Sequence, residues 1–308
     1  DRPKTAMRAF DLCGDCRHEY EDPLDRRFHA QPNACPVCGP QVWLCDQAGR
    51  TLPGDDPITA AAECLKQGQI LALKGLGGFH LAADARNAAA VRRLRDRKRR
   101  EEKPFALMAA DLGQIRQFAV VDDAALALLD SIQRPIVLLP KRAGHQIAAE
   151  VAPGNAFFGT MLPYTPLHHL LLQAGFLALV MTSGNLSEEP ICIDNDDALD
   201  RLGGIADRFL MHNRDIYLRS DDSIVRRAGG RTRFLRRSRG YVPVPVFLKK
   251  AQTSVLAVGG ELKNTVCLTR DRFAFVSQHI GDMENRQTDA FFKLTIDHLK
   301  RILDIRPE

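Results

Sequence analysis

Residues 94–108, LRDRKRREEKPFALM, join a dense basic run to an apolar segment, and the rest of the chain is best understood from this stretch. Between Arg92 and Lys103 there are eight Lys or Arg residues and three acidic ones, so this window carries a net charge of +5. The whole chain is also +5, so its excess charge is concentrated here. The apolar segment 105–108 is typical of a buried strand. A charged helix end before such a strand predicts a phosphate site at a pocket rim, and a solvated helix face is the alternative.

Length and composition limit the class of protein. A chain of 308 residues has room for two or three domains, and 45% hydrophobic with 26% charged residues is typical of a globular protein. The longest apolar run, residues 170–181, is interrupted by Gln173 and Gly175 and is too short to span a bilayer. No secretory signal opens the chain, and it lacks an initiator Met, so we expect a piece of a longer protein with no membrane segment.

The spacing of the first four cysteines predicts a metal site. Cys13-x2-Cys16 is followed by Cys35-x2-Cys38, and two such pairs present four thiolates to one Zn²⁺ in a tetrahedron. Redox thiols or disulfides are the alternatives. Four thiolates leave no open coordination position, so we expect a structural zinc that supplies folding energy to a small segment.

The other four cysteines indicate the redox compartment. They are scattered through apolar or mixed segments at Cys45, Cys64, Cys192 and Cys267. Without a secretory context we expect reduced thiols rather than disulfides, and hence a cytoplasmic protein.

Hydrophobic periodicity and turn residues predict alternating helices and strands after residue 52. Helices are expected at 57–68, 88–100, 112–118, 123–132, 194–202 and 289–303, and strands at 70–74, 105–108, 136–139, 176–181, 216–219 and 223–227. This pattern favours an α/β (α+β) fold. Residues 242–247, VPVPVF, are typical of an extended linker, and the chain after them reads as the β-rich start of a further domain.

Three segments contain further candidate binding residues. Lys74 ends the apolar strand 70–74, where it either contacts a ligand or extends to the surface. Residues 182–185, TSGN, follow the most hydrophobic strand, at an end where ligands bind in sheets covered by helices, although an ordinary turn has the same composition. From Arg226 to Arg239 there are seven Arg residues and no acid, which predicts a bound anion. For His168 and His169, packing or exposure is expected over catalysis.

Together, these segments resemble the HypF family of carbamoyltransferases, which mature nickel–iron hydrogenases. The similar segments, in this order, are DRRFHAQPNACPVCGP, KGLGGFHLAADA, RKRREEKPFALM, FGTMLPYTPLHHLLL, MTSGNLSEEPI, RRSRGYVP and VGGELKNTVCL. The resemblance covers essentially the whole chain. It implies a four-cysteine zinc finger in residues 1–51, a YrdC-like domain with a twisted mixed sheet and flanking helices in residues 52–248, and the start of a Kae1-like domain of actin/Hsp70 type in residues 249–308.

The resemblance also implies a reaction and its residues. Such enzymes form carbamoyl-adenylate from carbamoyl phosphate and ATP with Mg²⁺, and they pass the carbamoyl group to the C-terminal Cys of the partner HypE, where it becomes a cyanide ligand. The KxR motif falls on Lys98 and Arg100, which are implied to be catalytic by stabilising the phosphates, and the SxN motif falls on Ser183 and Asn185. The nucleotide- and carbamoyl-binding residues implied in this way are Lys74, Lys98, Arg100, Ser183, Asn185, Arg226, Arg236 and Arg239. The acylphosphatase motif and the body of the Kae1-like domain are missing, so we expect the adenylation half-reaction at most.

Two rival functions remain open from the sequence. Threonylcarbamoyl-AMP synthases of tRNA modification share KxR and SxN, but the finger and the KNTVCL continuation argue against that class. An RNA-binding module would combine a zinc finger with Arg-rich runs. The aromatic content is only 6%, with no aromatic residues between the basic ones for base stacking, so we do not expect nucleic acid binding.

Overall fold

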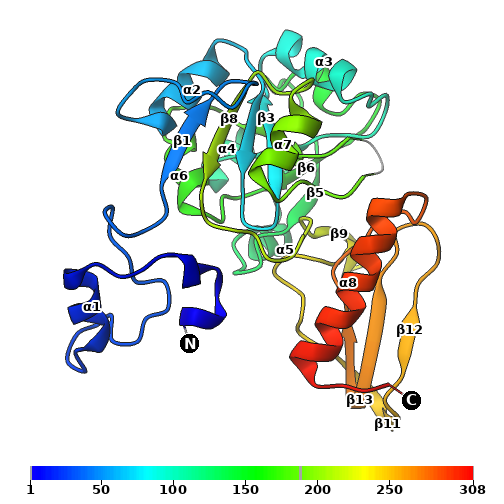
Figure 1. Ribbon diagram of the computed structural model, residues 1–308. Helices are drawn as coiled ribbons and strands as arrows, with labels where there is room; N and C mark the ends of the chain where they lie inside the picture. The colour runs from blue at the N-terminus through cyan, green and yellow to red at the C-terminus, as the bar shows by residue number, and fades with distance from the viewer. Residues whose placement is uncertain (1, 187–188, 308) are drawn as a thin grey trace.

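The computed structural model describes residues 2–186 and 189–307, which form three parts (Figure 1). A small cysteine-containing part (blue) and a C-terminal part with one long helix (orange and red) both lie below a larger central domain in this view. No helix in the described ranges has the length and apolarity needed to cross a membrane.

The central domain is built on a mixed sheet with the strand order β1-β8-β2-β3-β7-β4-β6-β5-β9-β10. Three neighbouring pairs are parallel, β2 with β8, β4 with β6 and β5 with β9, and the others are antiparallel. The strands are β1 (Val42–Cys45), β2 (Leu71–Lys74), β3 (Phe79–Asp84), β4 (Ala106–Met108), β5 (Ile136–Pro140), β6 (Phe157–Met161), β7 (Leu179–Ser183), β8 (Arg208–His212), β9 (Ile224–Ala228) and β10 (Arg231–Arg236).

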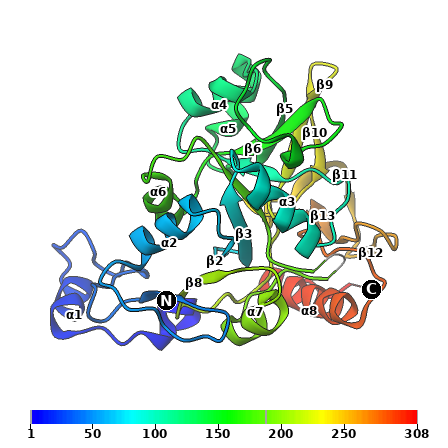
Figure 2. The ribbon, with the colours of Figure 1, turned by 90° about the horizontal axis from the view of Figure 1, so that it is seen from above.

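Helices cover both faces of this sheet (Figure 2). On one face, α2 (Pro57–Lys66) and α6 (Pro166–Leu172) pack through Leu65 and Leu171. On the other face lie α3 (Ala88–Arg97), α4 (Leu112–Phe118), α5 (Asp123–Leu129) and α7 (Asn195–Leu202). The strands alternate accordingly, because Leu71 and Leu73 pack on the first face and Ala72 on the second. The α2 and α6 helices cover only part of their face.

Side-chain caps explain where the helices begin. Asp56 accepts hydrogen bonds from the first turn of α2 and is followed by Pro57 at the first helical position. The Asn87 side chain caps α3 by accepting a hydrogen bond from the amide of Ala90. The Asp194 side chain caps α7 in the same way, by accepting from backbone amides in the first turn of that helix. All three helices were predicted from these residues.

The structure confirms most predicted elements and corrects several. Residues 216–219 form no strand, and the strand predicted at 176–181 runs instead over Leu179–Ser183. Strands β1, β3, β6, β8 and β10 lie outside the predicted strand ranges, and the glycine and proline residues near β3 and β6 made those two segments resemble loops. The α/β fold class with a mixed sheet is confirmed.

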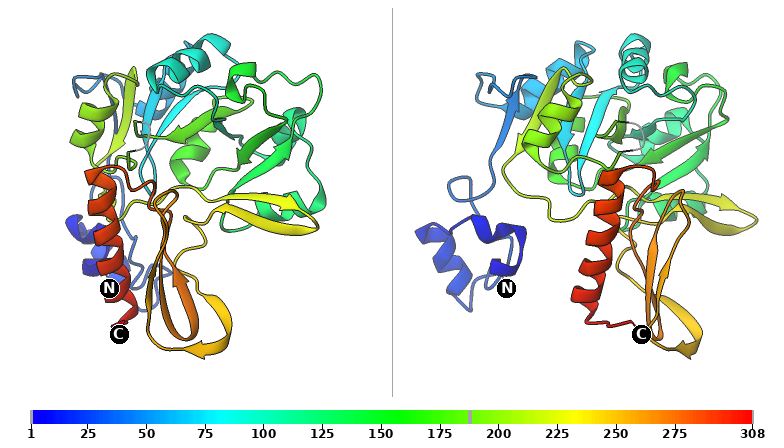
Figure 3. Two further views of the ribbon diagram at one scale, coloured as in Figure 1. Left: turned by 90° about the vertical axis from the view of Figure 1, so that its right-hand side faces the viewer. Right: turned by 45° about the vertical axis from the view of Figure 1, so that its right-hand side comes forward.

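The two smaller parts differ in how they connect to the sheet. The N-terminal part contains the short 3-10 helices Arg2–Lys4 and Ala6–Ala9 and the helix α1 (Gly14–Glu21). Strand β1 pairs with β8, so the last residues of the range predicted for the finger, 1–51, complete the central sheet. The C-terminal part has a second sheet in the order β11 (Val246–Gln252), β13 (Val266–Val276), β12 (Leu256–Val258), with α8 (Arg286–Leu303) packed on it (Figure 3). Most of the predicted linker therefore leads into β11.

Candidate functional site

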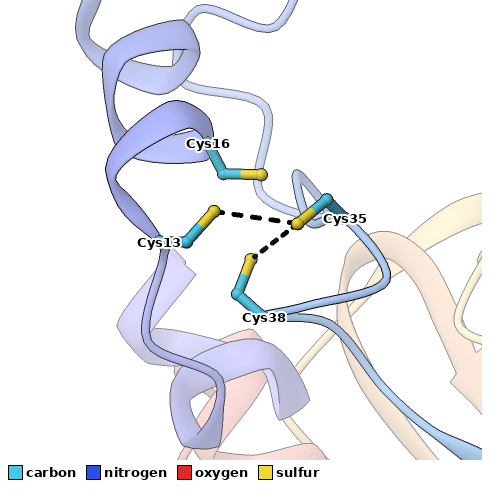
Figure 4. A group of neighbouring side chains, drawn as sticks. All are labelled: Cys13, Cys16, Cys35 and Cys38. Atoms are coloured by element: carbon cyan, nitrogen blue, oxygen red, sulfur yellow. Dashed lines mark hydrogen bonds between the residues drawn. The ribbon is translucent and has the colours of Figure 1, made fainter.

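The four paired cysteines come together in the N-terminal part (Figure 4). Cys13 precedes α1 and Cys16 lies in its first turn, while Cys35 and Cys38 lie on a tight turn closed by the bond from Gly39 N to Cys35 O at 2.8 Å. All four Sγ atoms lie within 4.8 Å of one another. The Sγ–Sγ distances Cys13–Cys35 and Cys35–Cys38 are 3.7 and 3.8 Å.

These distances fit a tetrahedral metal site. A centre with four Zn–S bonds of the usual length has sulfur–sulfur edges of about 3.8 Å. Backbone amides favour the thiolate form at Cys35 and Cys38, whereas burial raises the pKa of Cys16. The amides of Cys38 and Val37 lower the pKa of Cys35, and those of Cys13 and Cys35 lower the pKa of Cys38 to about 6. The cluster can therefore hold one tetrahedral metal ion with thiolate ligands.

A second site is a cleft of about 370 Å³ on the face of the central sheet that α2 and α6 leave open. It lies at the carboxyl end of β7 and the amino ends of β4 and β6, because the sheet is mixed. The lining of the cleft includes the apolar residues Phe105, Phe157 and Met181, the cations Arg100, Lys103, Arg226 and Arg236, and the polar residues His80, Thr182, Ser183, Asp221 and Asp222.

Lys98 is buried behind Ser183, outside the set of residues that line the cleft, and it connects the two predicted motifs. It follows the end of α3, and Arg99, with a φ of 51°, turns the chain back toward the sheet. The Lys98 Nζ donates to the carbonyl oxygens of Ser183 (2.7 Å) and Asn185 (2.5 Å) and to Asn185 Oδ1 (2.8 Å). The Ser183 hydroxyl donates to the same Oδ1 at 2.7 Å. Two segments 85 residues apart thus form one constellation.

Lys98, Arg100 and Lys103 each lie close enough to other cations for the pKa of each to be lowered. Burial and the nearby charge of Arg100 lower the pKa of Lys98 to about 7. Burial, Arg95 and Arg236 lower the pKa of Arg100 to about 10, and burial, Arg100 and Arg236 lower that of Lys103. An anion entering the cleft would relieve this mutual repulsion, so the site is suited to phosphate groups.

Only part of the basic run faces the cleft. Arg95 is buried and donates to the carbonyl oxygens of Arg100 (2.8 Å) and Glu101 (3.0 Å), so it holds the loop that carries Arg100. Arg97 forms an ion pair with Asp207 at 2.7 Å. The run is thus partly scaffold and partly site, a division that the sequence did not predict.

The other predicted binding residues are placed differently. Arg226 and Arg236 line the cleft, and the Arg226 guanidinium lies 4.4 Å over the Phe157 ring. Arg239 is not among the lining residues, because it pairs with Asp222 at 2.7 Å and stacks on Tyr164 at 3.5 Å.

Lys74 also lies outside this cleft, contrary to the expectation that it shares it. Its Nζ donates to the carbonyl oxygen of His212 at 3.1 Å, and the residue lines a separate cavity of about 560 Å³ beside Asp215 and Tyr217. The sequence placed Lys74 correctly at a strand end, but it did not show on which face of the sheet the side chain lies.

The structure adds a buried network that the sequence did not indicate. His80 pairs with Ser183 across β3 and β7, and its Nε2 lies 3.1 Å from Asp222 Oδ2. Burial alone raises the pKa of Asp222, but the hydrogen bond from His80 and the charge of Arg239 outweigh it and hold the pKa below its usual range. The adjacent Asp221 forms a hydrogen bond through its Oδ2 to Nδ1 of His279 in the C-terminal part, at 2.8 Å.

Comparison with protein families covers nearly the whole chain. A model described as HypF finger matches residues 12–45, one described as telomere recombination (Sua5/YciO/YrdC) matches residues 63–238, and one described as HypF Kae1-like domain matches residues 250–308. The chain belongs to the HypF family, with a Sua5/YciO/YrdC domain at its centre.

The curated relatives are longer than this chain. It is 49% identical to carbamoyltransferase HypF of Rhodobacter capsulatus over 100% of its own length and 41% of the relative's, and 48% identical to HypF of Synechocystis sp. over 100% and 47%. The chain therefore spans less than half of these proteins.

Solved structures agree with this assignment. A full-length HypF in its phosphate- and nucleotide-bound form superposes with a TM-score of 0.94 and 47% identity, over 100% of this chain and 40% of the other. The Sua5 protein of P. abyssi in complex with L-threonine has a TM-score of 0.53 at 17% identity, over 59% of this chain and 54% of that one, which shows a shared fold alone.

Proposed function

We propose that the central cleft binds ATP and carbamate, the latter derived from carbamoyl phosphate, and joins them as carbamoyl-adenylate. The observation that carries this proposal is the contact of Lys98 with both Ser183 and Asn185 beside a cleft of clustered cations. Membership of the HypF family supports the carbamoyl group as the acyl unit. A carbamate oxygen forms the new bond to the α-phosphorus, and pyrophosphate leaves with the electron pair of the broken bond.

The residues take distinct roles in this proposal. Arg100 lines the cleft and neutralises charge on the phosphates, which is the main requirement of an in-line displacement that needs no protein nucleophile. Lys98 is a positioning residue in the resting cleft, because its hydrogen bonds hold the Ser183–Asn185 turn. Ser183 and Asn185 orient the adenylate through hydrogen bonds. For Lys74 and Arg239 we retain no role in this cleft.

The metals and the compartment complete the proposal. The four-cysteine cluster holds a structural Zn²⁺, which its sulfur–sulfur distances and the HypF finger match support. Mg²⁺ bound to ATP would supply further neutralisation of the phosphate charge beside Arg100. None of the eight cysteines forms a disulfide, which supports a reducing compartment, the cytoplasm. In the longer protein of which this chain would be a part, the final acceptor of the carbamoyl group is the C-terminal Cys of HypE, as the resemblance to the HypF family implies.

Mass-spectrometric detection of adenylates tests the reaction. The chain is incubated with Mg²⁺-ATP in three parallel mixtures that contain carbamoyl phosphate, ammonium carbamate, or threonine with bicarbonate. We expect carbamoyl-adenylate with carbamate, and in the Arg100→Ala variant a yield lower by about a hundredfold. Threonylcarbamoyl-adenylate in the third mixture alone would move the chain to the tRNA-modification class. No adenylate with any mixture would contradict the proposal for this chain.

A further inference from the structure

One histidine of the C-terminal part contacts the wall of the central cleft. His279 follows β13, and its neighbours Gln278 and Ile280 are buried within the C-terminal part. The Nδ1 of His279 lies 2.8 Å from Oδ2 of Asp221, which lines the cleft. The two side chains are only 15% and 20% exposed, so water is largely kept from this contact. A residue outside the central domain therefore binds a residue of its cleft.

Asp221 is an acidic residue in a cleft that is otherwise suited to anions. Burial raises its pKa, but the charge of Arg236 and the hydrogen bond with His279 outweigh burial and hold the pKa below its usual range. The ionised carboxylate accepts, so the hydrogen lies on Nδ1 of His279. Burial lowers the pKa of Lys103, and the charge of Asp221 partly opposes this. The carboxylate thus acts electrostatically on two cations of the cleft.

The carboxylate nevertheless pairs with neither cation. In the described part of the chain, Asp221 has one charged partner within 4 Å, His279, while Arg236 and Lys103 have no acidic partner at that distance. The main chain of Asp221 is held in place, because the amide of Arg239 donates to its carbonyl oxygen at 3.0 Å. Only the side chain can therefore turn, and without its donor a shielded carboxylate would turn toward the nearby cations.

We propose that His279 is a positioning residue of the central cleft, which holds the Asp221 carboxylate away from Arg236 and Lys103 and so leaves these cations to an anionic substrate. This inference rests on the proposed function only in that the cleft takes up an anion such as ATP. It gives the C-terminal part a role in the central domain, because the charge of the cleft is set correctly only when His279 is in place.

Calorimetric binding of Mg²⁺-ATP to the full chain tests the role of His279, with neutral adenosine as the second probe. In His279→Ala we expect ATP affinity to fall about tenfold, because Asp221 then competes for the cations, and adenosine affinity to stay unchanged. His279→Asn should retain most of the affinity, since its amide N–H can replace the Nδ1–H donor. His298→Ala is the matched control, because His298 of α8 packs on Tyr217, and neither residue lines the cleft.

The double variant Asp221→Asn/His279→Ala separates positioning from a merely structural role. A neutral amide does not compete for the cations, so we expect ATP affinity to return to that of the unaltered chain. If His279 only docks the C-terminal part, the double variant binds ATP as weakly as His279→Ala, and the proposal is overturned. A loss of ATP affinity in Asp221→Asn alone would also overturn it, because Asp221 would then bind the substrate or its Mg²⁺ directly.

The outcomes also separate this role from the proposed reaction. If the unaltered chain forms carbamoyl-adenylate and the double variant does not regain ATP affinity, the proposed function stands and the role of His279 falls. If no adenylate forms and the double variant regains ATP affinity, the role of His279 stands and the reaction falls. A failure of the unaltered chain to bind ATP would overturn both.

Discussion

The Nζ of Lys98 lies 2.8 Å from Oδ1 of Asn185, and this contact holds the end of α3 against the end of β7. The same ammonium also donates to two main-chain carbonyl oxygens of that turn and so holds Ser183, which lines the cleft. Its 2% exposure means that water cannot replace these bonds when the side chain is changed.

The first prediction concerns the charge of Lys98. In Lys98→Met we expect carbamoyl-adenylate formation to fall by about a hundredfold, because the turn loses its donor. The pKa of Lys98 is lowered to about 7 by burial, so in the unaltered chain kcat/KM decreases as pH rises through about 7. Lys98→Arg should move this alkaline decrease to much higher pH, since Arg stays protonated. An unchanged alkaline limb in Lys98→Arg would assign the titration to another group.

The second prediction concerns stability and the buried pair of Asp222 with Arg239. Asp222→Asn leaves the Arg239 guanidinium buried without its charge partner, and we expect a loss of about 3 kcal/mol in the free energy of unfolding at pH 7. The folded pKa of Asp222 lies below its unfolded value of about 4. The carboxylate therefore contributes its full stability above pH 4 and loses it on further acidification.

Urea unfolding between pH 7 and pH 3 measures this effect. The difference between the unaltered chain and Asp222→Asn should be constant above pH 4 and shrink below it. A difference that grows on acidification would contradict the assigned sign. Asp130→Asn serves as a control, because the Asp130 carboxylate is exposed and its ion pair with Arg134 should contribute less than about 1 kcal/mol.

The third prediction uses the close approach of β7 to β3 at Gly184. A Cβ there would lie 2.7 Å from the Cβ of Phe79 and 2.8 Å from its carbonyl oxygen. Gly184→Ala should therefore push the strands apart, lower stability by about 1–3 kcal/mol and impair adenylation, since Ser183 precedes the clash. Gly204→Ala is the control, because a Cβ at that position would meet nothing within 4 Å. Equal thermal midpoints for both variants would refute the packing argument.

The fourth prediction concerns the cysteine cluster. Metal analysis should find about one zinc per chain in the unaltered protein and none in Cys35→Ser, because three thiolates no longer complete the tetrahedron. Proteolysis should then attack residues 2–40, while the central sheet unfolds at its usual denaturant concentration. Cys64→Ser is the control, as that thiol lies on α2, outside the cluster. Retention of zinc by Cys35→Ser would rule out the four-thiolate site.

Local patterns were predicted well. The CxxC pairs, the caps Asp56 and Asn87 and the apolar segment of β2 depend on spacings of a few residues, which the sequence shows directly. The resemblance to HypF, carried by such short segments, is confirmed by the family comparisons. Strands β3 and β6 were missed because the glycines before β3 and within β6 resemble loop residues in isolation, although a Cβ at Gly159 would meet the packed side chains of Ile136 and Leu138.

The amino-acid sequence by itself determined the cysteine tetrad, the order of most elements and the concentration of positive charge before β4. Only the tertiary structure decided which charges face the cleft: Arg100 and Arg226 do, whereas Arg239 is paired with Asp222 and Lys74 lies in another cavity. The physical reason is distance along the chain. His80 and Asp222 are 142 residues apart, and a partner so remote is chosen by sheet order and burial, which no local pattern encodes.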